Sequence, residues 1–172
     1  MFLGALLLFF ALAHVDQYES LILPLLSKDK PSDVASATKV REDEVLKVLV
    51  GFNDALKRAY SSLNPSGLFV FSMSDELRQN YLEELAFLKR DGRTMEVEVG
   101  AIKVKESRLL SPFMLKVRTV EPVAIRYVNI FDGTEIKSYP VVNYTVEYIF
   151  EIAPYGYKVV SVKTVQTEKN NG

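Results

Sequence analysis

Residues 141–152, Val-Val-Asn-Tyr-Thr-Val-Glu-Tyr-Ile-Phe-Glu-Ile, alternate between apolar and polar side chains. A period of two predicts a β-strand that turns one face toward a core and the other toward water. Glu147 and Glu151 fall on the polar face. The apolar face is predicted to comprise Val142, Tyr144, Val146, Tyr148, Phe150 and Ile152. This pattern is typical of an antiparallel sheet with one solvated side.

Further strand-like segments flank this one, so residues 94–166 as a whole are predicted to form a sheet. In the first segment the alternation changes phase at Gly100, which indicates a bulge. Glu121 and Pro122 are predicted to mark a bend or a sheet edge between the second and third segments. The additional strands are predicted at residues 94–104, 113–120, 123–131 and 157–166. The succession indicates a meander of four to five strands.

Two amphipathic helices are predicted before the sheet, because apolar residues recur there at helical spacing. The first covers about residues 41–63. The second follows Ser74, a typical capping residue, and ends at Gly92. Its buried stripe is predicted at Leu77, Tyr81, Leu85 and Leu88. Helices and strands together predict an α+β domain, in which two N-terminal helices pack on a mostly antiparallel sheet.

Two short features of the helical region carry predictions of their own. Glu83 and Glu84 are expected to face water, as charged residues on helix surfaces usually do. Residues 68–71, Leu-Phe-Val-Phe, are too few for a helix and are expected to plug the mouth of the core.

The composition excludes several classes of function. The chain of 172 residues carries 21 basic and 22 acidic side chains, so it lacks the excess positive charge of a nucleic-acid-binding protein. It contains no cysteine, which excludes disulfides, thiolate catalysis and cysteine-based zinc sites. Its one histidine is His14, near the N-terminus, so histidine-based catalytic triads and metal sites are also excluded. We therefore predict no metal, no cofactor and no nucleic-acid partner.

The N-terminal residues 2–13 form an uninterrupted apolar run that ends in Ala11-Leu12-Ala13, the pattern of a signal-peptide cleavage site. Twelve helical residues span only about 18 Å, which is less than a bilayer core. Residues 1–13 are thus predicted to be a signal peptide or a short membrane anchor. The organisation that follows is an amphipathic stalk and linker (14–40), a folded domain (41–166) and a frayed tail (167–172). We expect an exported or membrane-anchored protein; the alternative is a cytoplasmic protein with a buried N-terminal helix.

Several short motifs suggest a family. They are Tyr81-Leu82-Glu83-Glu84-Leu85, Gly92-Arg93, Glu96-Val97-Glu98-Val99, Phe131-Asp132-Gly133, Tyr139-Pro140-Val141-Val142 and Thr145-Val146-Glu147-Tyr148. In this order, residues 41–166 resemble the nuclear transport factor 2-like, cystatin-related superfamily. The pattern is most similar to the domain of plastid-division and cyanobacterial inner-membrane-space proteins, although Tyr157 stands where that family usually has Trp. The resemblance implies a curved, cone-shaped sheet whose interior is an enzyme pocket in some relatives and is filled with side chains in others.

An enzyme site inside such a cone would need an acid whose pKa is shifted by burial. The strand pattern places no carboxylate on the predicted inner face, so no catalytic residue is predicted. The candidate ligand-binding residues are Arg126, Tyr144, Tyr148 and Tyr81. Arg126 shares a strand face with apolar residues and could hold a ligand's carboxylate or phosphate. The alternatives are a surface arginine paired with Glu147 or Glu121, and tyrosines that are simply core residues.

These observations favour a non-catalytic extracytoplasmic module that binds a partner protein or a small, apolar, lipid-like ligand, as a subunit of an envelope-associated assembly would. The alternative is a small-molecule isomerase, hydratase or hydrolase that uses the cone as its active site. A homodimer through the outer sheet face is compatible with either function. An empty cone with a buried acid would favour the enzyme, whereas a cone filled by Phe69, Phe71 and Tyr148 would favour the module.

Overall fold

The computed structural model describes residues 42–169. The predicted leader, stalk and linker lie outside the described residues. Within them are three helices, α3 (Glu42–Ser62), α4 (Ser66–Val70) and α5 (Asp75–Arg90). The five strands are β1 (Arg93–Val99), β2 (Lys103–Ser111), β3 (Met114–Asn129), β4 (Glu135–Ala153) and β5 (Gly156–Lys169). This part of the chain is the predicted α+β fold, three helices on an antiparallel sheet. No helix within it has the length and hydropathy to span a bilayer.

The capping signals at both ends of α5 act as the sequence predicts. The Ser74 hydroxyl accepts a hydrogen bond from the backbone N–H of Leu77, 3.2 Å away, and so satisfies a donor of the first turn. At the other end, Gly92 has a φ of 71°, a left-handed conformation that glycine adopts readily. Residues next to the helix therefore fix where it begins and where it ends.

The prediction that residues 68–71 are too short for a helix was wrong, because Ser66–Val70 form α4. The turn is closed by a 2.8 Å hydrogen bond from the Leu68 N–H to the Pro65 carbonyl. Leu68 is fully buried, whereas Phe69 is 56% exposed and cannot plug the core. The apolar run therefore divides between the core and the surface.

Two predictions about the strands were wrong. The predicted first strand, residues 94–104, covers β1 and only the first two residues of β2, so most of β2 was not predicted; β1 and β2 both pair with β3. The predicted second and third strands are one, because β3 continues through Pro122. The two errors meet at one contact, where the Gly100 N–H donates to the Pro122 carbonyl at 2.7 Å. A Cβ at position 100 would lie 3.2 Å from the Pro122 side chain, a tight contact that favours glycine at this crossing.

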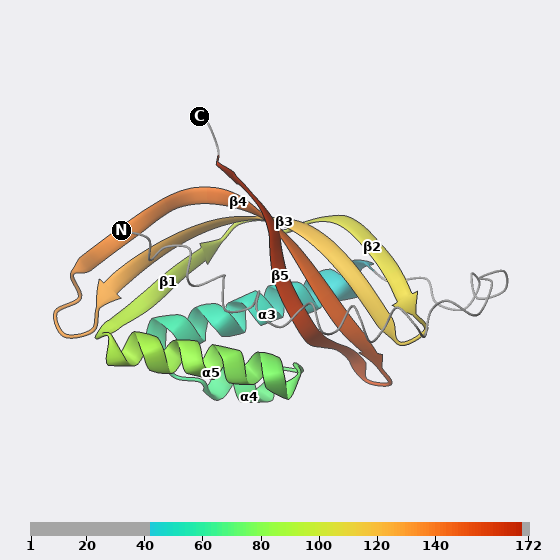
Figure 1. Ribbon diagram of the computed structural model, residues 1–172, viewed down its shortest axis with the longest axis horizontal. Coiled ribbons are helices and arrows are strands. Elements are labelled where there is room, and N and C mark those ends of the chain that lie inside the picture. The colour runs from blue at the N-terminus through green and yellow to red at the C-terminus, as the bar shows by residue number, and fades with distance from the viewer. Residues whose placement is uncertain (1–41, 170–172) are drawn as a thin grey trace. The chain divides into compact units, whose positions relative to one another are not determined.

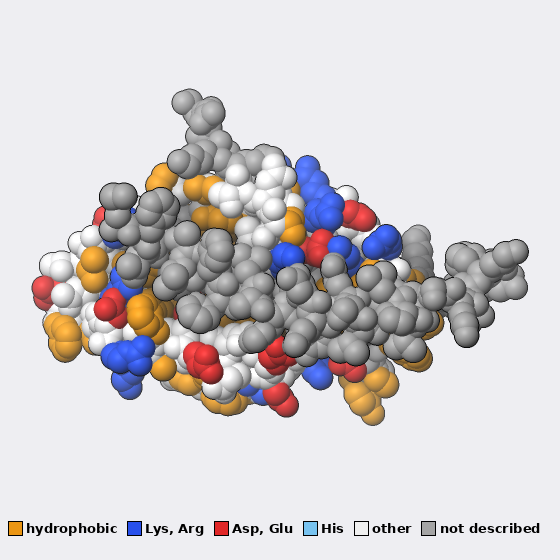
Figure 2. Space-filling view, in the orientation of Figure 1, with side chains coloured by type: hydrophobic (Ala, Val, Ile, Leu, Met, Phe, Trp, Pro, Cys, Tyr) orange, Lys and Arg blue, Asp and Glu red, His pale blue; other side chains and the backbone are white. Residues whose placement is uncertain are grey.

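The strand order is β1-β3-β4-β5, with β2 also paired to β3, and all the ladders are antiparallel. The sheet arches over the three helices, which cover its concave face (Figure 1). The buried apolar side chains of β3 and β4 face those helices and include Leu115, Val117, Val146, Tyr148 and Phe150. On the outside, Lys and Arg side chains gather over β2 and the adjoining strands (Figure 2).

Candidate functional site

A carboxylate lies on the inner face of the sheet, which corrects the prediction that this face has none. Glu121 of β3 is only 3% exposed. Its Oε1 accepts hydrogen bonds from the Thr119 hydroxyl at 2.6 Å and from the Tyr148 hydroxyl at 2.9 Å. Burial raises the pKa of Glu121 above its usual value, and hydrogen bonds from Thr119, Tyr148 and Asn53 partly oppose that rise.

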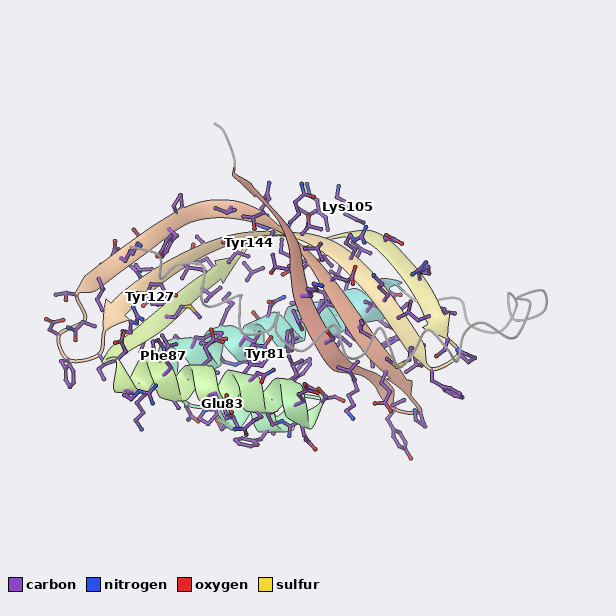
Figure 3. The ribbon with its side chains drawn as sticks, viewed as in Figure 1. Tyr81, Glu83, Phe87, Lys105, Tyr127 and Tyr144 are labelled. Carbon is purple, nitrogen blue, oxygen red and sulfur yellow. The ribbon has the colours of Figure 1, made fainter. Side chains whose placement is uncertain are left out.

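A second carboxylate faces the interior from α5. Glu84 was predicted to face water, but it accepts a hydrogen bond from the Tyr60 hydroxyl of α3. Burial raises the pKa of Glu84 to about 7, although the Tyr60 hydrogen bond lowers it. Glu83, the adjacent residue, is exposed as predicted and lies on the side of α5 away from the sheet (Figure 3). Only one of the two neighbouring acids is therefore part of the interior.

Both acids could have been found from the sequence. Glu121 lies two residues after the inward-facing Thr119, so its direction follows from the strand period once β3 continues through Pro122. Glu84 lies three residues after Tyr81 and seven after Leu77, on the same helical stripe. Glu121 was missed because it was predicted to mark a bend or a sheet edge, and Glu84 because charged residues of a helix surface were expected to face water.

Tyrosine side chains connect the two acids. The pKa of Tyr81 is raised first by burial and then by the negative charges of Glu84 and Glu121, so the phenol lies within electrostatic range of both. Burial also raises the pKa of Tyr127 to about 12. These phenols remain protonated at neutral pH, so each keeps an O–H group that is able to donate a hydrogen bond. Tyr81 and Tyr127 lie between the sheet and the helices in Figure 3.

Aromatic rings fill the interior around Glu121. The Phe52 ring of α3 lies 5.4 Å from Phe71, 6.0 Å from Tyr81 and 6.3 Å from Tyr148, measured between ring centroids. Tyr148 in turn stacks on Phe150 at 6.0 Å. Tyr148 and Phe71 therefore contribute to the packed interior, as expected for a filled cone, while Phe69 does not.

The four predicted ligand-binding residues do not come together. Tyr81 and Tyr148 lie in the interior, and Tyr144 is paired in register with Glu121, so it shares the inner face. Arg126 instead lies on the outer face, 54% exposed, where its Nε donates to Glu96 at 2.8 Å. Their ligand-binding role stays a prediction.

The partners predicted for Arg126 were wrong. Its ion-pair partner is Glu96, the residue opposite it in the ladder between β1 and β3. Glu147 pairs with Lys116 at 2.7 Å and with Arg118 at 3.3 Å on the outer face. These cations lower the pKa of Glu147, even though burial raises it. The outer face is thus a network of ion pairs, and a homodimer through it stays a prediction.

One interior cation was not anticipated from the sequence. Arg93 of β1 lies over the rings of Phe87 and Tyr127, with its guanidinium carbon 5.8 and 4.9 Å from their centroids. Its Nε also lies 2.7 Å from the Asp91 carboxylate. Arg93 precedes the buried Met95 by two residues, so the strand period places it on the inner side.

The interior groups can hold and exchange protons but do not form a metal site. Within the described residues, no group of three His, Asp or Glu side chains is arranged to bind a metal ion. Glu84 changes its protonation near neutral pH, whereas Glu121 is held among hydroxyl donors.

Comparison with known proteins shows the fold and no sequence family. No family model and no curated protein match the chain. The intermembrane space region of chloroplast protein ARC6 is 10% identical, with a TM-score of 0.62 over 74% of this chain and 97% of that one. A periplasmic fragment of TraM is 15% identical, with a TM-score of 0.49 over 76% and 99% of the two chains. An NTF2-like protein of unknown function from Prochlorococcus marinus is 12% identical, with a TM-score of 0.45 over 78% and 96%. The predicted α+β fold is confirmed by the helices and the antiparallel sheet of the described residues, and the ARC6 domain has a similar architecture.

Proposed function

We propose that this chain is a non-catalytic binding module that works outside the cytoplasm and is held at a membrane through residues 1–13. The observation that supports it best is the state of Glu121, which is buried and bonded to Thr119 and Tyr148. An acid that serves a substrate must be able to reach it, whereas Glu121 has its donors within the protein. The acid thus belongs to the framework of the domain.

The surroundings of Glu121 support the same reading. The rings of Phe52, Phe71 and Tyr148 pack against one another beside it, so side chains occupy this part of the interior. A buried polar network whose members are all bonded makes a core rigid and specific. Such a domain presents its binding groups on its surface and not in its interior.

The membrane location rests on the apolar run at residues 2–13 and on the fold. The ARC6 domain of similar architecture comes from an intermembrane space, so this fold is used beside a membrane. A fusion of the full chain to alkaline phosphatase, at its C-terminus, tests the location in a Gram-negative host. We expect an active phosphatase in the membrane or periplasmic fraction, because this reporter folds only after export.

A matched variant carries Leu7→Arg, which breaks the apolar run and should abolish phosphatase activity. The proposal requires an active phosphatase. A fusion protein that is full-length, inactive and located in the cytosol would refute export. Equal activity of the variant and the parent would show that residues 2–13 do not direct it.

Glu84 favours a second candidate function, proton transfer on a small molecule. Its pKa of about 7 is near the optimum for a general acid or base, and the Tyr60 hydroxyl contacts it. Proton NMR of cyclohexanone in D₂O would detect exchange of the α-protons. Exchange that is lost in Glu84→Gln but kept in Glu83→Gln would support this candidate against the binding module.

A further inference from the structure

Two adjacent hairpin turns at one end of the sheet each present an exposed aromatic side chain. Phe113, between β2 and β3, is 70% exposed, and Tyr155, between β4 and β5, is fully exposed. Each follows an exposed proline. The turns are joined by a 2.8 Å hydrogen bond from the Ile152 N–H to the Phe113 carbonyl. They form one protruding end, which we call the aromatic end, and both lie at the same end of the sheet in Figure 1.

The strands that lead to the aromatic end are basic. Residues 103–118 and 147–163 carry seven Lys or Arg and three Glu, in a chain whose net charge is −1. Arg108 and Lys158 are the cations of β2 and β5 nearest the turns; Arg108 is exposed, and Lys158 is half-buried and lies 3.3 Å from the Glu151 carboxylate. In Figure 2 Lys and Arg side chains gather over the crest of the sheet above the aromatic end, with Asp or Glu side chains among them. The remainder of the chain therefore carries the excess of negative charge.

We propose that the aromatic end rests on an anionic membrane surface, with Phe113 and Tyr155 inserted at the level of the headgroups. Aromatic side chains favour the interfacial region, where their rings are desolvated and a tyrosine hydroxyl stays hydrated. Lys and Arg beside an anionic bilayer add electrostatic attraction. This inference rests on the proposed function, because residues 1–13 would bring the domain within reach of the bilayer.

The shape of the aromatic end favours a bilayer over a protein partner. Its two aromatic residues stand at the tips of turns, so they project from the molecule. Protein interfaces instead require a broad surface of matching shape. A bilayer accepts projecting rings because its interface is fluid.

A third hairpin provides a matched control at the opposite end of the sheet. Phe131, between β3 and β4, is 85% exposed, much like the other two aromatic residues. The turn itself, residues 129–136, contains Asp132 and Glu135 and no Lys or Arg. An anionic bilayer should not attract this turn.

The chain has no tryptophan, so single substitutions provide a clean fluorescent reporter. The full-length protein would be prepared as Phe113→Trp, Tyr155→Trp and Phe131→Trp, and reconstituted with phosphatidylcholine vesicles that contain phosphatidylglycerol and brominated acyl chains. We expect a blue shift and bromine quenching for the reporters at 113 and 155. The reporter at 131 should be unquenched and open to aqueous acrylamide.

The electrostatic part of the docking is tested by changing the charge of the protein, the salt concentration and the charge of the lipid. Arg108→Gln should weaken the docking equilibrium of the aromatic end by about fivefold, the value expected for one cation at an anionic surface. Raised salt should have the same effect, because it screens the attraction. Vesicles of brominated phosphatidylcholine without phosphatidylglycerol should show little quenching.

The outcomes separate this inference from the proposed function. Protein that fails to float with the vesicles would overturn the membrane location itself. Protein that floats but shows no quenching at 113 and 155 would overturn only the docking of the aromatic end. A reporter at 155 that is shielded from acrylamide without bromine quenching would indicate a protein contact, which also contradicts the proposal.

Discussion

At the scale of single residues, the pKa of Glu84 links the fold to pH. Burial raises this pKa from 4.5 to about 7, so the folded state binds a proton that the unfolded chain has already released between these values. The stabilising effect of that proton is complete below pH 4.5 and is lost as the pH rises through about 7. A shift of this size corresponds to on the order of 3 kcal/mol.

Urea denaturation of Glu84→Gln against the parent protein, at pH 5 and pH 8, measures this effect. The parent should lose more free energy of unfolding between the two pH values than the variant does, because Gln cannot ionise. Glu83→Gln is the matched control, since Glu83 is exposed on the same helix. A variant that loses as much stability as the parent would show that Glu84 titrates normally.

The sequence periodicity predicted part of the interior. The periodicity predicted that Tyr148 faces inward, and the structure agrees. It did not predict the two acids, because Glu121 was expected to mark a bend or a sheet edge with Pro122, and Glu84 was expected to face water. What the sequence could not supply is the set of hydroxyl donors around each acid, because those donors come from distant positions.

At the scale of elements, Ser74 joins α5 to the sheet. Its hydroxyl caps α5 through the Leu77 N–H and also lies 3.3 Å from the Val160 carbonyl of β5. Ser74→Ala should lower the free energy of unfolding by about 1 kcal/mol, the usual value for a lost N-cap. The measurement is again urea denaturation. Ser72→Ala, at an exposed position nearby, should leave stability unchanged, and equal losses in both variants would refute the capping role.

Element boundaries were predicted less well than element types. Gly100 and Pro122 were taken as a bulge and a bend, but they are the place where β3 exchanges one neighbour, β2, for another, β1. That exchange depends on a contact between residues far apart in sequence, so no local pattern reveals it. The short helix α4 was missed for a similar reason, since burial of Leu68 stabilises a turn that propensity alone would not.

At the scale of the whole molecule, one curved sheet separates two different surfaces. Its concave side holds Glu84 and Glu121 among aromatic rings, while its convex side carries ion pairs such as the one between Lys116 and Glu147. The fold class followed from the order of the elements, because two helices and then a meander admit few arrangements. The sequence motifs led to the same fold as the similarity to the ARC6 domain.

The central claim, that the interior acids belong to the framework of a binding module, is tested most directly by a double-mutant cycle on Glu121 and Tyr148. The free energy of unfolding would be measured for Glu121→Gln, Tyr148→Phe and the double variant. We predict that each single variant is destabilised and that the two changes couple by about 1–2 kcal/mol, because a buried hydrogen bond is lost in either case. Single variants that are more stable than the parent would contradict the claim, since relief of strain on substitution is typical of a site built for chemistry.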